Sequence, residues 1–399
     1  MSTSESTDLA GLRVCVVYDC LFPWTTGGAE RWYREVAEYL EAAGANVRYL
    51  TRLQWSAANA PEIPGVEVVV VAPESELYEP DGTRKVFPPL RFGLGVFLWF
   101  VRHRREVDVV QLANFPFFSL IAARLALFGS DARIYVDWLE IWPRRFWIGY
   151  AGRGAGELGF IIQWLCIRLT QHALVFWSPA GALLRQQGYK RDVTTLAGLL
   201  PRVAIETRSI AARSATPSAL FVGRLIHDKG VRLLPEMVRL VLLGRPDFRL
   251  VVVGTGPEAD LMTRLFAELG VSARVDQLGF VSDEELERLR AEASCTIVAS
   301  TREGYGISAV ESLASGTPIV VASNPQNLAV HHVVEGVNGF VVEPSAAGLA
   351  NGVALAIAGG EDLRIATREW FSENAPLMTV DRSLGEVVAL YANQAKQRR

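Results

Sequence analysis

Two cationic side chains flank one short loop in the second half of the sequence. A strand-like apolar stretch runs into Gly223-Arg224-Leu-Ile-His-Asp-Lys229-Gly230, and a helical pattern follows. Arg224 and Lys229 are therefore expected to point at one spot beyond the strand. Two cations beside a helix N-terminus suit a diphosphate. Two solvated surface charges are the alternative, but the flanking glycines and the presence of only four lysines in 399 residues favour the diphosphate.

Two glutamates follow in another strand-to-helix segment, Ser300-Thr-Arg-Glu303-Gly-Tyr-Gly-Ile-Ser-Ala-Val-Glu311. Glu303 precedes a glycine-flanked turn, and Glu311 is expected about two turns further on, in the following helix. Carboxylates accept hydrogen bonds on both oxygens, which suits the hydroxyls of a sugar and of a ribose. A solvated glutamate pair is the alternative. The start of this helix would offer successive backbone N–H groups, from Gly304, Tyr305, Gly306 and Ile307.

Two more loops of this half follow strand-like segments. Gly254 lies in Val253-Gly-Thr-Gly-Pro257, where the proline fits a first helical turn. Phe280 and Val281 lie in Gln277-Leu-Gly-Phe-Val-Ser282. A loop of this kind can present backbone donors and acceptors to a flat base.

A double glycine, Gly27 and Gly28, ends the loop after the first strand-like segment. Glycine lets the backbone approach a ligand closely and take positive φ. The helix expected from about Ala29 would offer free N–H groups to a phosphate. A tight turn explains the pattern equally well. The loop has no GxGxxG spacing, which argues against an ordinary dinucleotide enzyme.

These loops require parallel sheets to position them. Apolar β-branched runs alternate with amphipathic stretches, which predicts an α/β fold of doubly wound parallel sheets whose ligands bind beyond the carboxyl ends of the strands. Strands are expected at 12–18, 47–50, 66–71, 107–112, 133–136 and 173–177, then at 219–222, 248–253, 275–278, 295–299 and 318–321. Helices are expected at 30–43, 115–127, 158–171, 231–243, 258–269 and 283–293.

Two Rossmann-like domains are expected, at 1–200 and 201–379. A chain of 399 residues is too long for one ordinary core. Residues 201–217 are rich in Arg, Ala and Ser without periodicity, which indicates a connection. A final helix at 380–397 would pack on either domain. Two such sheets in series predict a cleft between them, with one substrate held by each.

Composition excludes several classes of protein. The net charge of −3 gives no support for a nucleic-acid partner. Four scattered cysteines, without a CxxC pair or a nearby His, argue against a disulfide framework or a zinc site. Residues 1–8 are polar and acidic, unlike a signal peptide, and no uncharged apolar stretch is long enough to span a bilayer. A cytoplasmic location is therefore expected.

Taken together, these motifs resemble the family 4 retaining glycosyltransferases of GT-B architecture. The specific signal is Glu-Gly-Tyr-Gly-Ile-x-x-x-Glu at 303–311. It is joined by the Gly-Arg-Leu and Lys-Gly segments at 223–230, by Gly-Thr-Pro at 316–318, and by Asn-Gly at 338–339. The resemblance covers most of the chain, is strongest from 220 to about 344, and includes Gly-Gly-Ala-Glu at 27–30.

The resemblance implies a role for each residue. Arg224 and Lys229 would bind the diphosphate of a nucleotide-sugar donor, Glu303 the transferred sugar, and Glu311 the ribose. The amides of 304–307 would contact sugar and phosphate, and 278–281 would cradle the base. Gly28 would approach the diphosphate from the first domain as the cleft closes. The final helix would cross back to the first domain.

It also implies a mechanism. Relatives retain anomeric configuration, in a front-face displacement in which the leaving phosphate takes the acceptor proton. Cations and amides stabilise the leaving group, so no metal or other cofactor is expected. Many relatives carry a His after the fourth strand of the first domain, whereas this chain has Asn114 in that segment. Either Asn114 or the next loop substitutes for it, or no side chain is needed there.

The next loop suggests an acceptor site. It reads Val136-Asp137-Trp-Leu-Glu140-Ile-Trp-Pro, with two carboxylates among aromatic residues. Aromatic faces suit sugar C–H surfaces and carboxylates suit hydroxyls, so Asp137 and Glu140 are acceptor candidates. The alternative is a Trp-rich interface with Asp137 as a helix cap.

Residues 90–105 combine an apolar body with the cationic end Arg102-His-Arg-Arg105, as interfacial helices do. A helix that covers a parallel sheet is also apolar, so peripheral contact with the inner membrane face is one of two interpretations. The expected partners are a nucleotide sugar, UDP- or GDP-linked, and a glycan, lipid-linked or small-molecule acceptor.

Two other functions stay open from the sequence. One is a non-catalytic GT-B protein that binds sugars or a partner, which the missing His allows. The other is an inverting GT-B transferase or epimerase, although those lack the spaced glutamate pair. The donor sugar, the linkage and the oligomeric state are not specified by the sequence.

Overall fold

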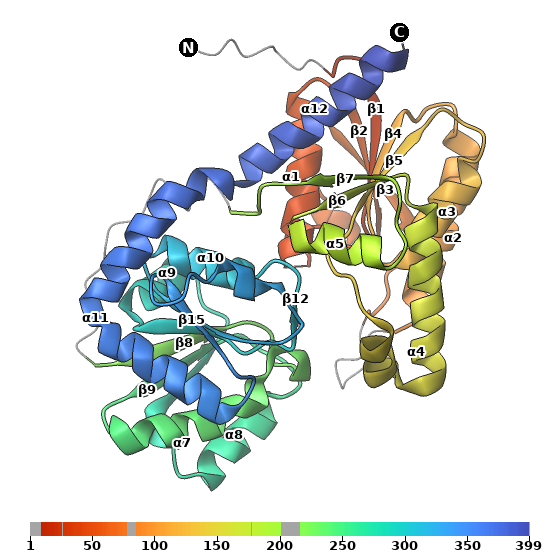
Figure 1. Cartoon of the computed structure of the whole chain (residues 1–399). Helices are drawn as coiled ribbons and strands as arrows, with labels where there is room; N and C mark the ends of the chain where they lie inside the picture. The colour runs from red at the N-terminus through yellow and green to blue at the C-terminus, as the bar shows by residue number, and fades with distance from the viewer. Residues whose placement is uncertain (1–8, 26, 78–84, 177, 201–215, 399) are drawn as a thin grey trace, which may run out of the picture. The chain divides into compact units, whose positions relative to one another are not determined.

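A computed structural model describes residues 9–25, 27–77, 85–176, 178–200 and 216–398 (Figure 1). The chain divides into two compact units. The described residues up to Leu199, together with the C-terminal helix α12 (Val380–Arg398), form unit 1. Leu200 and the described residues from 216 to Thr379 form unit 2. These limits lie next to the boundaries at 200 and 379 expected from the sequence.

Unit 1 is a seven-stranded parallel sheet in the order β3-β2-β1-β4-β5-β6-β7. Its central strands are buried on both faces, which explains why they read as continuous apolar runs. The strands are β1 (Arg13–Val17), β2 (Asn46–Arg52), β3 (Val66–Ala72), β4 (Val109–Ala113), β5 (Arg133–Asp137), β6 (His172–Val175) and β7 (Asp192–Thr195). The helices are α1 (Gly28–Ala42), α2 (Phe87–His103), α3 (Phe117–Ala126), α4 (Arg144–Leu169) and α5 (Ser178–Gln186).

The final helix α12 packs on unit 1, as the family resemblance implied. It runs beside α1 (Figure 1). The hydroxyl of Tyr391 on α12 donates to Oε1 of Gln111 on β4 at 2.7 Å. Near the start of α12, the Ser383 hydroxyl lies 2.8 Å from the backbone nitrogen of Gly198 and 2.7 Å from its carbonyl oxygen. Residues almost 300 positions apart thus share one core.

Unit 2 is a six-stranded parallel sheet in the order β10-β9-β8-β11-β13-β15. The strands are β8 (Ser218–Val222), β9 (Arg249–Val253), β10 (Val275–Gly279), β11 (Cys295–Val298), β13 (Ile319–Ala322) and β15 (Gly339–Val342), and the short β12 (Arg302–Glu303) pairs with β14 (Gln326–Asn327). The helices are α7 (Leu234–Gly244), α8 (Ala259–Glu268), α9 (Asp283–Glu292), α10 (Ile307–Ala314) and α11 (Ala346–Asn374).

The doubly wound parallel α/β fold expected from the sequence is confirmed in both units. The expected strands are present within a few residues of their predicted ends, although residue 177 lies outside the described residues. Strands β7 and β15, helix α5 and the long helix α11 were missed. The helix expected at 158–171 begins earlier, at Arg144, and bends at Gly152, which has a φ of 77°. The connection expected at 201–217 lies outside the described residues up to 215.

Candidate active site

The strand order of unit 2 defines where its site lies. Strands β8 and β11 are neighbours in the middle of the sheet, and the chain proceeds from them toward opposite edges. In such sheets the crevice beyond the carboxyl ends, at this switch point, is the usual ligand site. The loop after β8 carries Arg224 and Lys229, and the loop after β11 carries Glu303. The sequence candidates of unit 2 therefore flank one switch point.

Backbone hydrogen bonds tie these loops together. The Gly223 amide donates to the Val253 carbonyl at 3.0 Å, and the Gly254 amide donates to the Gly279 carbonyl at 2.8 Å. The Thr301 amide donates to the Asp228 carbonyl, also at 2.8 Å. The loops after β8, β9, β10 and β11 thus form one connected backbone layer, which fixes the side chains that they carry.

Gly254 has a structural reason to be glycine. Its φ is 133°, and a Cβ at this position would lie 2.0 Å from the carbonyl oxygen of Gly223. The loops after β8 and β9 approach each other too closely for any side chain. The role of Gly254 in donor binding therefore remains a prediction, whereas its role in packing these loops is visible.

The two residues expected at diphosphate and sugar contact each other. Lys229 Nζ donates to Glu303 Oε2 at 2.6 Å, and the two side chains are 25% and 17% exposed. The Ser300 hydroxyl donates to the same oxygen at 3.1 Å. Beside them, Arg302 Nε donates to Asp228 Oδ2 at 2.9 Å. Two ion pairs therefore connect the loop after β8 with the loop after β11.

The other side chains expected to contact the donor lie on the loops after β8 and β10. Arg224 is exposed directly after β8. Phe280, after β10, is 79% exposed, which leaves its ring available to a flat ligand. Val281 is half-buried and packs against the small cluster of Leu220, Val253 and Ala293.

Helix α10 begins where the sequence placed it. Gly306 is its N-cap with a φ of 81°, and a Cβ there would lie 2.7 Å from the Cβ of Ala329. The Tyr305 side chain is only 7% exposed and its ring packs edge-on against His332. His332 Nε2 donates to the Tyr305 carbonyl at 2.7 Å, and burial lowers the pKa of His332 to about 4. The buried, neutral imidazole of His332 thus fixes the turn 303–306 by a hydrogen bond to its backbone.

Glu311 lies in the second turn of α10 and is paired with a residue that the sequence did not single out. Arg290, near the end of α9, donates through a terminal nitrogen to Oε2 of Glu311. Arg290 is 5% exposed. In the sequence, Arg290 follows the apolar positions Leu286 and Leu289 at helical spacing, which places it near the buried face of the helix. Spacing alone does not pair it with Glu311.

The glycine loop of unit 1 differs in detail from its prediction. Helix α1 begins at Gly28, one residue before the expected start. The expectation of positive φ was wrong, because Gly27 is extended at φ 176° and Gly28 is the first helical residue. Close approach to a phosphate at this helix start remains a prediction for both glycines, without help from an unusual backbone conformation.

Asp137 does not lie at the surface. Its exposed fraction is 0%, and its carboxylate accepts hydrogen bonds from Trp32 Nε1 at 3.1 Å and from Gln111 Nε2 at 3.0 Å. Burial raises its pKa to about 6, although these hydrogen bonds favour the charged form. The suggested contact between Asp137 and an acceptor is therefore corrected: Asp137 ends β5 inside unit 1, and Gln111 links it to Tyr391 of α12.

Asn114 is also inside, with 3% exposure. Its Nδ2 donates to the Glu140 carbonyl at 3.1 Å, and its Oδ1 accepts from the Leu139 amide at 3.2 Å. Asn114 thus fixes the next loop, and its substitution for a sugar-binding histidine stays a prediction. Glu140 is partly exposed, and its Oε2 accepts from Trp142 Nε1 at 2.8 Å. Of the three acceptor candidates, Glu140 alone keeps access to solvent.

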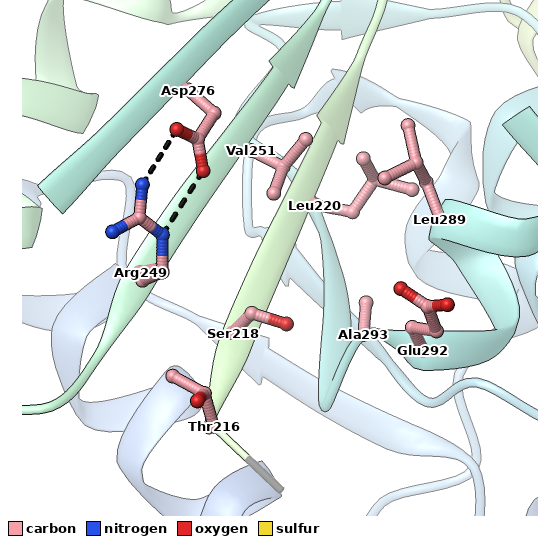
Figure 2. Close-up of a pocket in the computed structure, with 9 residues that line it drawn as sticks. All are labelled: Thr216, Ser218, Leu220, Arg249, Val251, Asp276, Leu289, Glu292 and Ala293. Carbon is pink, nitrogen blue, oxygen red and sulfur yellow. Dashed lines mark hydrogen bonds and ion pairs between the residues drawn. The ribbon is translucent and has the colours of Figure 1, made fainter. Parts of the chain in front are cut away.

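A pocket in unit 2 lies at the other end of the sheet. Figure 2 shows Arg249 on β9 hydrogen bonded to both carboxylate oxygens of Asp276 on β10, at 3.0 and 2.6 Å. Ser218 and Arg249 are the first residues of their strands, so this pocket lies at the amino ends. It is separate from the loops that carry Lys229 and Glu303. Among the described residues, no group of three or more His, Cys, Asp or Glu side chains is arranged to hold a metal ion.

The chain is similar in sequence to known glycosyltransferases. Residues 205–378 match the family model described as glycosyl transferases group 1. A glycosyltransferase of Methanocaldococcus jannaschii is 38% identical over 116 residues, 29% of this chain and 30% of that protein. The 2-deoxystreptamine glucosyltransferase of Streptomyces kanamyceticus is 34% identical over 99 residues, 25% and 26% of the two chains. A D-inositol 3-phosphate glycosyltransferase of Corynebacterium urealyticum is 29% identical over 229 residues, 52% and 53% of the two chains.

The chain thus spans 26% to 53% of the length of these curated relatives. Solved structures match over far more of it. Sucrose-phosphate synthase from Thermosynechococcus elongatus superposes with a TM-score of 0.77 at 16% identity, over 97% of this chain and all of that one. Anabaena HepE in complex with UDP gives 0.73 at 17% identity, over 96% and 100%. The resemblance to proteins of GT-B fold is confirmed, and the glycosyl transferases group 1 model covers most of unit 2.

Proposed function

We propose that this chain is a retaining glycosyltransferase that moves a hexosyl group from a nucleoside diphosphate sugar to an acceptor hydroxyl. The observation that carries the proposal is the contact between Lys229 and Glu303 at the switch point of the unit 2 sheet. A cation suited to phosphate and a carboxylate suited to sugar hydroxyls lie side by side there. A donor whose phosphate is bonded directly to its sugar fits this pair.

The reaction follows from the charges. The bond between the anomeric carbon and the diphosphate oxygen breaks, and negative charge develops on the leaving phosphate. Arg224, Lys229 and the amides at the start of α10 stabilise that charge without a metal ion. The leaving phosphate oxygen takes the proton of the acceptor hydroxyl, whose oxygen bonds to the same face of the sugar. The anomeric configuration is retained.

The donor is tested directly. Purified protein is incubated with UDP-, GDP- and ADP-linked hexoses, and release of the nucleoside diphosphate is measured with and without candidate acceptors. Release that falls strongly in Arg224→Ala supports the proposal. Arg239→Ala is the matched control, because Arg239 lies on the surface of α7 and pairs only with Glu236 among the described side-chain contacts.

Two other outcomes decide between the alternatives. Tight nucleotide binding without release from any donor, and without transfer, would favour a non-catalytic sugar-binding protein. A product of inverted anomeric configuration, read by NMR, would contradict the retaining mechanism. We infer that UDP-linked sugars are the first donors to test, since solved structures of Anabaena HepE with this fold hold UDP and UDP-glucose.

We also propose that one face of unit 1 lies on a membrane surface, where an amphiphilic acceptor would be found. Helices α2, α3 and α4 lie together on one side of the unit (Figure 1). Helix α2 buries Phe92, Val96 and Phe100, so it packs on the unit as one interpretation of its sequence required. Its opposite stripe is nevertheless exposed and apolar, at Phe87, Leu90, Leu94, Leu98 and Val101.

Helix α4 also exposes apolar side chains, and its charges are mostly positive. Leu158, Ile161 and Trp164 are 58%, 56% and 42% exposed. Helices α2 and α3 carry no acidic residue, and the single acidic residue of α4, Glu157, pairs with Arg144. No helix of the described residues has the length and apolarity to cross a bilayer. An apolar stripe with cations suits the surface of an anionic bilayer instead.

Sedimentation with vesicles tests this surface. The protein is expected to sediment with phosphatidylglycerol vesicles and much less with phosphatidylcholine vesicles. The double change Leu94→Glu and Leu98→Glu is expected to abolish sedimentation. Leu243→Glu, at a 74% exposed position of α7, is the matched control and should bind as the unchanged protein does. No sedimentation with anionic vesicles would remove the membrane from the proposal.

A further inference from the structure

Arg290 connects two helices of unit 2 from the inside. It lies near the end of α9, and its side chain is 6% exposed. One terminal nitrogen donates to Oε2 of Glu311 on α10, and the other donates to Oε1 of Glu287 at 3.1 Å. Both carboxylates are more exposed than the guanidinium, at 17% for Glu311 and 38% for Glu287. The cation therefore lies behind Glu311 and not in front of it.

The backbone around Arg290 is fixed independently of any ligand. The Arg290 carbonyl accepts from the Thr317 hydroxyl at 2.6 Å. Arg364, which is 2% exposed, donates to the carbonyls of Ala291 and Ala293, each at 2.8 Å. The end of α9 is thus anchored by two side chains from other elements. A guanidinium mounted on this frame has a defined position.

The contact constrains Glu311 in a specific way. A free glutamate on a helix surface samples several rotamers, and fixing one of them costs conformational entropy. The ion pair with a buried, planar guanidinium selects one of those rotamers before any ligand arrives. A carboxylate has about four acceptor sites on its two oxygens, so a contact at Oε2 leaves capacity for hydroxyl donors.

We propose that Arg290 is a positioning residue that orients Glu311 to accept hydrogen bonds from the ribose hydroxyls of the donor nucleotide. The inference rests on the proposed function, in which Glu311 binds the ribose. It adds a residue from α9, outside the glycine-rich loops, to the determinants of nucleotide recognition. Arg290 itself does not touch the nucleotide.

Nucleotide selectivity tests this role. UDP, GDP and ADP are titrated into the full-length protein by calorimetry, and the tightest is compared with its 2′,3′-dideoxy counterpart. The unchanged protein is expected to prefer the ribonucleotide by roughly tenfold or more, the size of a hydrogen bond to a charged group. In Arg290→Met this preference should fall below about threefold, because Glu311 is no longer held in one orientation.

Two further variants make the result specific. Arg288→Met is the matched control: it lies on the same helix, is 51% exposed, and pairs with Glu285 and Glu292. Its preference should equal that of the unchanged protein. Arg290→Lys keeps the charge but loses the planar guanidinium with its two terminal nitrogens. Its preference for the ribonucleotide should lie between those of the unchanged protein and Arg290→Met. If Arg290→Met does not fold, Arg290→Lys decides, and an unchanged ratio there overturns the proposal.

The outcomes separate the two proposals. A purely structural role of Arg290 would weaken both nucleotides equally and leave their ratio intact, which overturns the positioning role. Nucleotide binding by the unchanged protein without any preference for the ribonucleotide overturns it too, while leaving sugar transfer untouched. Failure to bind any of the three nucleotides overturns the donor site and this inference together.

Discussion

Lys229 Nζ lies 2.6 Å from Glu303 Oε2, although the two residues are 74 positions apart. The hydrogen bond joins the end of the loop after β8 to the short strand β12 after β11. Both side chains are partly exposed, so water and ligand groups reach the pair. A donor diphosphate would share the ammonium with Glu303, and the sugar would share the carboxylate with Lys229.

Removal of either partner is expected to lower transfer by different routes. In Lys229→Met the leaving phosphate loses one cation, and kcat should fall by about 10²–10³, as for loss of one oxyanion donor. In Glu303→Gln the sugar loses a charged acceptor and Lys229 loses its partner. Steady-state kinetics with the best donor measure both effects. The control Arg239→Met should retain the full rate, and an equal loss there would show that the effect is not specific to the pair.

Gly306→Ala is expected to destabilise unit 2 and to displace the start of α10. Two costs add: a φ of 81° that alanine adopts poorly, and a contact of 2.7 Å with Ala329. A loss of about 1–3 kcal/mol in the free energy of unfolding is expected. Urea unfolding measures it. Gly336→Ala is the control, because its φ is 73° and its Cβ would meet nothing within 4 Å. An equal loss in both variants would assign the cost to φ alone.

Asp137 is expected to act on stability and not on the acceptor. Its pKa is raised from 3.8 to about 6, so between these values the folded state holds a proton that the unfolded chain has released. The free energy of unfolding of unit 1 therefore falls as pH rises through this window, by roughly 3 kcal/mol in total. Asp137→Asn should flatten that slope and leave the KM for the acceptor unchanged.

Hydrogen–deuterium exchange of peptides from β4 reads this slope at several pH values. Asp131→Asn, at an exposed position of the same unit, is the control and should keep the slope of the unchanged protein. A selective rise in the acceptor KM of Asp137→Asn, without loss of stability, would restore Asp137 as an acceptor residue.

His332 is expected to give unit 2 the opposite pH dependence. Its pKa is lowered from 6.5 to about 4, so between these values the unfolded chain binds a proton that the folded state excludes. Stability is therefore present above pH 6.5 and is lost as pH falls toward 4. His332→Gln should reduce this dependence, measured by exchange of peptides from β13. The neighbouring, exposed His331→Gln is the control, because burial is the larger cause of the lowered pKa of His332. A slope reduced there as much as in His332→Gln would contradict the assignment.

The sequence predicted the elements more closely than the contacts. Each strand of the switch point was identifiable because a buried parallel strand is apolar on both faces, whichever residues surround it. Weak elements were missed for the same reason: β7 is half exposed, with the pattern Asp192-Val-Thr-Thr195. The glycine loops were recognisable because glycine is required where loops pack as closely as Gly254 and Gly223 do.

The sequence by itself determined that the chain has two doubly wound units. It also determined which strand precedes each loop that carries a candidate residue, namely Arg224, Lys229, Glu303 and Glu311. Those properties depend on local pattern and on the rules of parallel sheets. Only the tertiary structure decided that Asp137 is buried, that Lys229 contacts Glu303, and that Arg290 lies behind Glu311. These facts depend on which side chains meet across elements, and pairings between residues far apart in the chain leave no spacing to read.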